Sequence, residues 1–141
     1  MHAGFPLPDP NWEPTRPFWE GAARGVLLLP HCEGCARIGW YPDRCLDCGS
    51  SDYLWREVAG TGRLFTWVVV RHAFLPQFRG EVPFTSALVS MDVDPRVRLP
   101  TRIVQADVDS LAIDQPLEVC FRELRFEGVE GAIRAPFFRP G

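Results

Sequence analysis

Residues 32–48 read CEGCARIGWYPDRCLDC and decide the fold of this chain. They contain two pairs of cysteines, with two residues between the members of each pair and nine residues between the pairs. A tight turn aims the two sulfurs of one pair at a common point, and two such turns complete a tetrahedron in which zinc lies ~2.3 Å from each thiolate. The spacing therefore predicts a metal site formed by Cys32, Cys35, Cys45 and Cys48.

The four cysteines could instead form disulfides or hold iron. Disulfides are disfavoured because cysteines two residues apart seldom reach disulfide geometry without strain, and because the sequence shows no secretory signal. Thiolates are soft ligands that bind iron as well as zinc, so the type of ligand does not decide between the two metals. We expect zinc, the usual metal of a short closed ribbon, with iron as the alternative. Four protein sulfurs leave no open coordination position, so the predicted role of the metal is structural.

The composition indicates a globular protein with no membrane segment. Apolar residues make up 46% of the 141 residues, which is ordinary for a chain with a hydrophobic core. No apolar run approaches the ~18 residues that a membrane span needs, and we expect a cytoplasmic location. The formal net charge is -3, and every basic residue is an arginine. This balance disfavours nonspecific binding to nucleic acid, whereas arginine suits phosphate or carboxylate recognition; a codon bias explains the arginines equally well.

Residues 1–25 are predicted to form a proline-rich arm followed by a short helix. The prolines up to Pro14 favour extended backbone, so the arm either frays or wraps its aromatic residues onto the body or a partner. Thr15 can cap a helix that has Pro17 in its first turn and that ends near Gly25.

The predicted fold class is mainly β, with a rubredoxin-like zinc ribbon over residues 26–52 and a five-stranded OB-fold barrel over residues 53–141. A short helical segment at residues 107–113, between the third and fourth barrel strands, favours this barrel over a small β-sandwich. Gly60 and Gly62 are expected to form a bulge or sharp bend at the start of the first barrel strand. The ribbon strands are expected at 26–29 and 38–41, and the barrel strands at 63–71, 84–91, 98–105, 117–122 and 131–138.

The loop after the first predicted barrel strand is a candidate contact surface. Residues 71–80 read RHAFLPQFRG, so aromatic residues stand between two arginines. Loops of OB-folds flank the ligand surface, and aromatic residues with arginine are typical interface anchors. The alternative is that these aromatic residues fold back as a lid on the barrel. The residues predicted to contact a partner or an acyl-CoA are Arg71, His72, Phe74, Phe78 and Arg79.

The sequence contains no convincing catalytic set. His31 adjoins a metal cysteine but would be a fifth candidate at a four-coordinate site, so we expect it outside the ligand set. His72 could act as a general base, yet no nucleophile or carboxylate partner is identifiable. Cys120 is predicted to be a packing residue in a strand. The chain is therefore predicted not to be catalytic by itself, and the rival hypothesis is a nucleic-acid-binding protein, which the acidic total disfavours.

Several motifs, taken in order over residues 18–138, resemble a known family. They are Phe18-Trp19, the two cysteine pairs, Tyr41-Pro42 between them, Gly60-Thr61-Gly62 with Phe65-Thr66, Pro83, Ala87-Leu88-Val89 and Phe137-Phe138. This order resembles the zinc-ribbon and OB-fold proteins associated with acyl-CoA enzymes, known as domain of unknown function thirty-five. Ala36 stands where many such ribbons have a glycine after the second cysteine.

The resemblance implies an accessory subunit rather than a self-sufficient enzyme. Members of the family pair with thiolase-like enzymes, including aldolases that shorten steroid side-chain CoA thioesters and the thiolase and synthase of archaeal isoprenoid synthesis, and some are fused to hydratase-like domains. By this resemblance the chain would bind a thiolase-like aldolase or acyltransferase as a hetero-oligomer, hold a structural Zn²⁺ and help to shape the acyl-CoA site.

Overall fold

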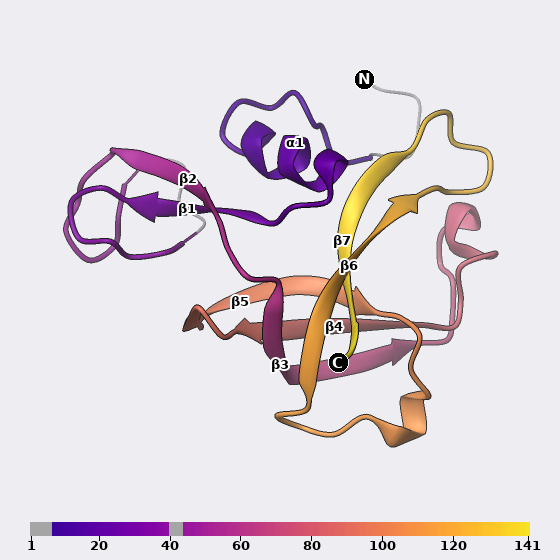
Figure 1. Cartoon of the computed structure of the whole chain (residues 1–141). Coiled ribbons are helices and arrows are strands. Elements are labelled where there is room, and N and C mark those ends of the chain that lie inside the picture. Colours follow the sequence, from indigo (N-terminus) through magenta and orange to yellow (C-terminus); the bar gives the residue numbers. More distant parts are fainter. Residues whose placement is uncertain (1–6, 40–43) are drawn as a thin grey trace.

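The computed structural model describes residues 7–39 and 44–141 and consists of a helix, a two-stranded sheet and a barrel (Figure 1). Tyr41 and Pro42, which carry part of the family resemblance, lie outside the described residues. The elements are α1 (Arg16–Arg24), β1 (Leu28–Cys32), β2 (Tyr53–Glu57), β3 (Thr61–Val70), η1 (Pro76–Phe78), β4 (Phe84–Met91), β5 (Asp94–Ile103), η2 (Val108–Ser110), β6 (Pro116–Leu124) and β7 (Ile133–Pro140).

The predicted helix is confirmed as α1. It begins after Thr15, although the Thr15 side chain does not make the predicted capping hydrogen bond, and it has Pro17 in its first turn, where the missing backbone N–H costs nothing. It ends at Gly25, whose φ of 77° lies in the left-handed region that glycine adopts readily. Phe18 and Ala22 are four residues apart, share one face and are buried, and the helix packs against β7 and β1.

The two-stranded sheet pairs β1 with β2, and this pairing differs from the predicted ribbon. The predicted return strand at 38–41 is reduced to an isolated bridge between Ile38 and His31, and residues 40 and 41 lie outside the described part of the chain. Instead, β2 runs antiparallel to β1, with Cys32 opposite Tyr53. The strand after residue 53 thus pairs with the ribbon, and the barrel strands start at Thr61. The division of the chain at residue 53 stays a prediction.

The barrel is closed in the strand order β3-β4-β5-β7-β6, with β3 pairing with β6. It has five strands and a short helical turn, η2, between the third and fourth, as predicted. The side chains at its centre are almost inaccessible, because each strand points alternate residues inward. The largest of them are Leu64, Val89, Met91, Leu99, Leu117 and Phe138.

Gly60 and Gly62 allow neighbouring strands to approach closely at the start of β3. A Cβ atom on Gly60 would lie 1.9 Å from Cγ1 of Val119, and one on Gly62 would lie 2.5 Å from the backbone oxygen of Ser90. No real contact is so short, so a side chain at either position would force the strands apart. The two glycines therefore serve barrel closure, and the irregularity in the pairing of β3 with β4 lies just after them, between Leu64 and Thr66.

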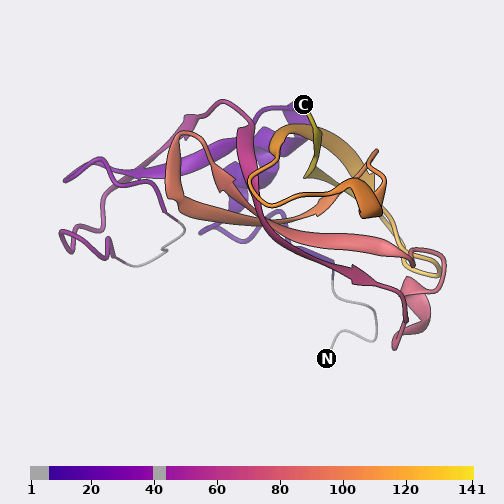
Figure 2. The ribbon, with the colours of Figure 1, turned by 90° about the horizontal axis from the view of Figure 1, so that it is seen from below.

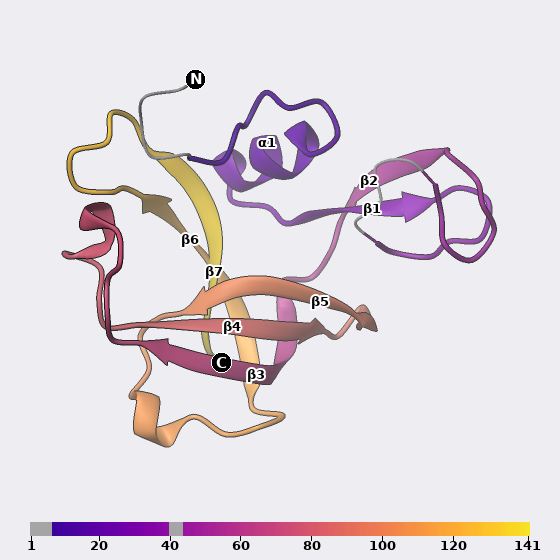
Figure 3. The same ribbon diagram turned by 180° about the vertical axis from the view of Figure 1, so that it is seen from behind.

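The ribbon and the loops around η1 lie at opposite ends of an elongated molecule (Figure 2). Residues 71–83, here called the β3–β4 loop, contain η1, and residues 125–132 form the β6–β7 loop. The two loops lie side by side (Figure 3), and the rings of Phe78 and Phe126 are 5.1 Å apart between centroids. In an OB-fold, loops in these two positions border the ligand-binding surface. No described helix has the length and apolar character to cross a membrane.

Candidate metal centre

Two similar backbone turns position the cysteines. In the first, the N–H of Ala36 donates to the carbonyl of Cys32 at 2.8 Å, and in the second the N–H of Gly49 donates to the carbonyl of Cys45 at 2.9 Å. Ala36 and Gly49 both have a positive φ, of 61° and 74°. Gly34 lies inside the first turn, where a Cβ atom would be 3.1 Å from the Cys48 sulfur. The turn residues of the sequence thus form two matching knuckles, as the spacing predicted.

The four sulfur atoms converge, as the sequence predicts for a metal site. All four lie within 4.8 Å of one another, and the Cys32–Cys48 and Cys35–Cys45 sulfur pairs are each 3.5 Å apart. A tetrahedron of sulfurs about 2.3 Å from a central zinc has edges of about 3.8 Å, so the cluster has the size that such an ion needs. The sulfurs are too far apart to be disulfides, which join at about 2.05 Å. Cys32 and Cys45 are buried, whereas Cys35 and Cys48 face the surface.

The sulfurs strongly change one another's affinity for protons. The backbone N–H of Cys48 lowers the pKa of Cys45 to about 7. The backbone N–H of Arg37 favours the Cys35 thiolate, but the Cys45 sulfur, burial and the other two cysteines together raise the pKa of Cys35 to about 12. Four sulfurs at this separation cannot all be thiolates unless a cation compensates their charge. The donor set therefore fits a divalent metal that binds four thiolates.

Two further residues next to the cluster are outside the ligand set. Nδ1–H of His31 donates to the carbonyl oxygen of Leu29 at 2.9 Å, and the metal-binding group contains only cysteines, so the expectation for His31 agrees with the geometry. The hydroxyl of Tyr53 is buried and has no hydrogen-bond partner among the described residues. Burial, followed by the charge of Cys45 and the other cysteines, raises the pKa of Tyr53.

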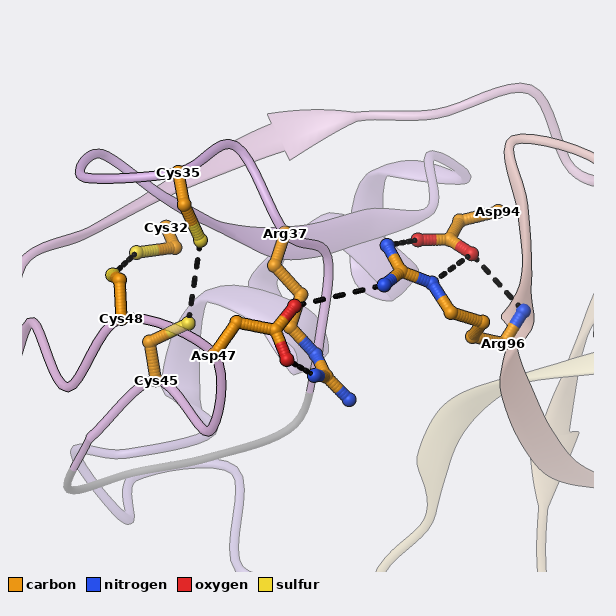
Figure 4. A network of polar contacts seen from close by, with 8 residues as sticks. All are labelled: Cys32, Cys35, Arg37, Cys45, Asp47, Cys48, Asp94 and Arg96. Carbon is orange, nitrogen blue, oxygen red and sulfur yellow. Dashed lines mark hydrogen bonds and ion pairs between the residues drawn. The ribbon is translucent and has the colours of Figure 1, made fainter.

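A chain of ion pairs connects the knuckles to the barrel (Figure 4). Arg37, next to the first knuckle, donates to Asp47 inside the second knuckle. Nη1 of Arg96 lies 3.6 Å from the Asp47 carboxylate, and Nη2 of Arg96 lies 2.8 Å from Asp94. The side-chain hydrogen bond from Arg96 is the main reason that the pKa of Asp94 is lowered. Arg96 belongs to β5, so this ion-pair chain joins the metal-binding turns to the barrel.

The structure separates the five residues predicted to contact a partner. The Phe74 side chain is 90% exposed, and its only described ring contact is an edge-on one with His72 at 4.9 Å. Phe78 instead folds back onto the barrel, stacked on Phe84 at 6.0 Å and edge-on to Phe126. Arg71 and Arg79 are exposed at the two ends of the same segment. Phe74 is thus exposed as a contact residue would be, whereas Phe78 covers the barrel as the alternative hypothesis expected. The role of the loop in contacting a partner stays a prediction.

An apolar groove of about 930 Å³ lies between the N-terminal segment and the barrel. The sequence did not predict this groove, because its walls come from seven separate parts of the chain, between Pro8 and Phe137. The sequence feature that could have indicated the groove is the set of tryptophans and phenylalanines in the predicted arm and helix. The described part of the arm lies against the rest of the molecule and forms one wall of the groove. The main aromatic residues that line the groove are Trp12, Phe18, Trp19, Trp55, Phe78 and Phe126.

The fold and the cysteine cluster define a class of protein in which a four-cysteine ribbon precedes an OB-fold barrel. The family model that matches the chain describes the C-terminal OB-fold domain of ChsH2 and covers residues 55–122. A solved chain of the "Ltp2-ChsH2(DUF35) aldolase" is similar over 96% of this chain and 98% of its own length, with a TM-score of 0.74 and 27% sequence identity.

Relatives from three organisms extend this similarity. A DUF35 domain-containing scaffold protein of Methanothermobacter thermautotrophicus is 30% identical over 113 residues, which is 77% of this chain and 82% of that protein. A protein of the same description from Methanocaldococcus jannaschii is 24% identical over 121 residues, 83% of either chain. A probable enoyl-CoA hydratase alpha subunit of Thermomonospora curvata is 30% identical over 135 residues, but this chain spans only 40% of its length.

The chain belongs to the DUF35 family, because a full-length member shares 30% identity over most of both chains. The family resemblance that the sequence motifs indicated is thereby confirmed, together with the order of ribbon and barrel.

Proposed function

We propose that this chain is a non-catalytic accessory subunit that binds and supports a thiolase-like acyl-CoA aldolase or acyltransferase. The observation that carries the proposal is the similarity, over nearly the whole of both chains, to the DUF35 chain of an Ltp2-ChsH2 aldolase. The description of two archaeal relatives as scaffold proteins supports an assembly role. The relative described as a hydratase subunit supports work on a CoA thioester. The family resemblance of the sequence motifs adds steroid side-chain degradation as the pathway in which such an aldolase would work.

The metal in this proposal is a structural Zn²⁺. Cys32, Cys35, Cys45 and Cys48 would occupy all four positions of a tetrahedral ion, which leaves none for water or substrate. The ion would fix the two knuckles and, through Asp47, the contact between ribbon and barrel. The metal thus supports the shape of the subunit, and the partner enzyme supplies the chemistry.

The exposed tip of the β3–β4 loop is the proposed anchor on the partner. Phe74 is the most exposed large apolar residue of the described chain, and Leu75 beside it is 48% exposed. A protruding aromatic residue that enters a pocket on a partner is a frequent hot spot in protein interfaces. The neighbouring Phe78 is already engaged within the barrel, so it would support the loop from behind.

The test is capture of a purified thiolase-like enzyme from the same genome by the immobilised, metal-loaded chain. Phe74→Ala should weaken capture by about tenfold or more, since hot-spot truncations typically cost 2 kcal/mol or more. It should leave the melting temperature unchanged, because the ring makes little contact within the chain. Ile113→Ala is the matched control, since Ile113 is also exposed, at 66%, but lies between η2 and β6. Absence of any complex with wild-type chain would refute the proposed function.

A further inference from the structure

A second pocket, which shares Arg102, Leu124 and Phe137 with the apolar groove, opens at the end of the barrel that carries the β3–β4 and β6–β7 loops. It has a volume of about 580 Å³, within the range of small-molecule sites. Its walls come from the end of β3, the start of β4, the end of β5 and the end of β6. These are the elements from which the two ligand-bordering loops of an OB-fold emerge. We call this cavity the arginine pocket.

The charge of the arginine pocket is opposite to the charge of the whole chain. Four arginines and two glutamates line it, whereas the chain as a whole has a net charge of -3. The codon-bias explanation accounts for arginine in place of lysine, but it does not account for the gathering of four arginines around one cavity. Such a local excess of positive charge attracts anions. The charged lining residues are Arg71, Arg102, Arg122, Arg125, Glu81 and Glu123.

Two of these arginines are engaged with the glutamates. Arg102 is largely buried, donates to Glu81 at 2.8 Å and lies 3.9 Å from the centre of the Phe84 ring. Arg125 donates to Glu123 at 2.9 Å on the rim. Both glutamates are thereby neutralised, and Arg102 is held rigidly as part of the wall.

The other two arginines have no such partners. Among the residues that the structure describes, neither the Arg71 guanidinium nor the Arg122 guanidinium has a hydrogen bond, an ion pair or a ring contact. Arg71 follows β3 and Arg122 lies near the end of β6, two strands that pair only over Thr61–Arg63 at their other ends. Both guanidinium groups line the same pocket, and their N–H donors are available for a ligand.

We propose that the arginine pocket binds a small organic phosphate, with Arg71 and Arg122 as the phosphate ligands. Each guanidinium group can donate two parallel hydrogen bonds to phosphate oxygens. A phosphate offers more acceptor oxygens than a single carboxylate, so it is the better ligand for two arginines. The remainder of the wall includes Phe84, Ile103 and Phe137, which offer apolar surface to a nucleoside or another organic part. The identification of that phosphate with the nucleotide end of a CoA thioester rests on the proposed function.

Size and charge favour a small ligand over a nucleic acid. The pocket has room for a nucleotide-sized molecule, and its arginines gather around one cavity rather than along a positive track on which a polymer backbone could lie. Outside it the acidic composition would repel the remaining phosphates of a polymer.

Isothermal titration calorimetry of the 141-residue, metal-loaded chain at low salt provides the test, with coenzyme A, ADP, inorganic phosphate and a single-stranded oligonucleotide as separate probes. Wild-type chain should bind coenzyme A and ADP more tightly than inorganic phosphate. The double variant Arg71→Ala with Arg122→Ala should bind both at least about tenfold more weakly, because it removes two charge-assisted contacts. Arg56→Ala is the matched control, since Arg56 is an exposed arginine on β2 outside the pocket, and it should bind like wild type.

Three results would overturn the proposal. They are no binding of coenzyme A or ADP by wild-type chain, equal affinity of the double variant, and a preference for the oligonucleotide that falls steeply with salt. The third would favour the nucleic-acid hypothesis instead. Circular dichroism should show that the double variant folds, since both side chains are exposed. Capture of the thiolase-like enzyme is measured in parallel, so loss of phosphate binding with intact capture would leave the proposed function standing.

Discussion

Ala36 has a backbone conformation that an L-residue adopts only at a cost. It has a φ of 61° in the first knuckle, where the second knuckle has Gly49. The left-handed region costs an L-residue roughly 1–2 kcal/mol, and a glycine avoids most of this cost while it gains entropy in the unfolded chain. We expect Ala36→Gly to stabilise the metal-loaded chain by about 0.5–1 kcal/mol in urea unfolding.

The control for this substitution is Ala23→Gly on the exposed face of α1. There the backbone is helical, so the same chemical change should destabilise the chain, by about 1 kcal/mol for an exposed helix position. If Ala36→Gly also destabilised the chain, the left-handed geometry of the first knuckle would be wrong.

Cys45 is one of the two buried cysteines of the cluster, and its sulfur lies 3.5 Å from that of Cys35. We expect Cys45→Ser to abolish both metal binding and soluble folding, since a serine hydroxyl is a poor replacement for a thiolate. Metal content by mass spectrometry and the soluble yield measure the two effects. Cys120→Ser, at the half-buried thiol outside the cluster, should retain the metal and the soluble fold. A soluble, metal-free Cys45→Ser protein that still binds its partner would contradict this prediction.

At the scale of single residues, the sequence predicted the cysteine cluster but could not assign the two loop phenylalanines. The cysteine ligands come in local pairs, so their geometry follows from turns of a few residues. Phe78 is held by Phe84 and by Phe126, and the latter is almost fifty positions away in the sequence. Such a contact depends on the placement of β4 and β6, which spacing within residues 71–80 does not encode. The same limit applies to the arginine pocket and to the apolar groove.

At the scale of elements, the ion pair between Asp47 and Arg96 couples the second knuckle to β5. Both side chains are partly exposed, so their attraction should be modest and sensitive to salt. We expect a double-mutant cycle of Asp47→Ala and Arg96→Ala on the metal-loaded chain to give a small favourable coupling energy at low salt. The coupling should vanish near about 1 M NaCl, where the Debye length is about 3 Å.

The cycle has an internal control in the pair Arg125 and Glu123. These residues also form an exposed ion pair, at 2.9 Å, but they are two positions apart on the barrel rim and join no separate elements. Their substitution should leave the stability of the ribbon unchanged. Additivity of Asp47→Ala and Arg96→Ala at low salt would mean that the ion-pair chain does not connect ribbon and barrel.

The pairing of β2 shows why the order of elements was easier to predict than their partners. The sequence marked the barrel strands well, and the interval 84–91 agrees with β4. Residues 53–57 alternate like a barrel strand, since Tyr53 and Trp55 are half-buried while their neighbours are exposed. That alternation fits any half-covered sheet, so it cannot tell a barrel edge from a hairpin with β1. The partner of β2 is β1, which packs against α1 and leads into the first knuckle.

At the scale of the whole molecule, the ribbon and the barrel share one hydrophobic core. The buried cluster runs from Phe18 on α1 and Leu29 on β1 to Leu64 and Phe138 in the barrel. Structural zinc in short peptides contributes on the order of 10 kcal/mol, and entire domains are stable by about 5–15 kcal/mol. Removal of the proposed zinc would therefore remove a free energy comparable to the stability of the whole chain.

We accordingly expect chelation with EDTA to unfold the chain as one cooperative unit. Hydrogen exchange followed by mass spectrometry should show that amides in β1 and in β4 lose protection together, because the two strands belong to the same core cluster. Addition of excess zinc should restore both, whereas addition of magnesium, which prefers oxygen ligands, should restore neither. If β4 stayed protected while β1 exchanged, ribbon and barrel would be separate folding units divided near residue 53. The partner surface on the β3–β4 loop would then survive without metal, and capture by the chelated chain would reveal it.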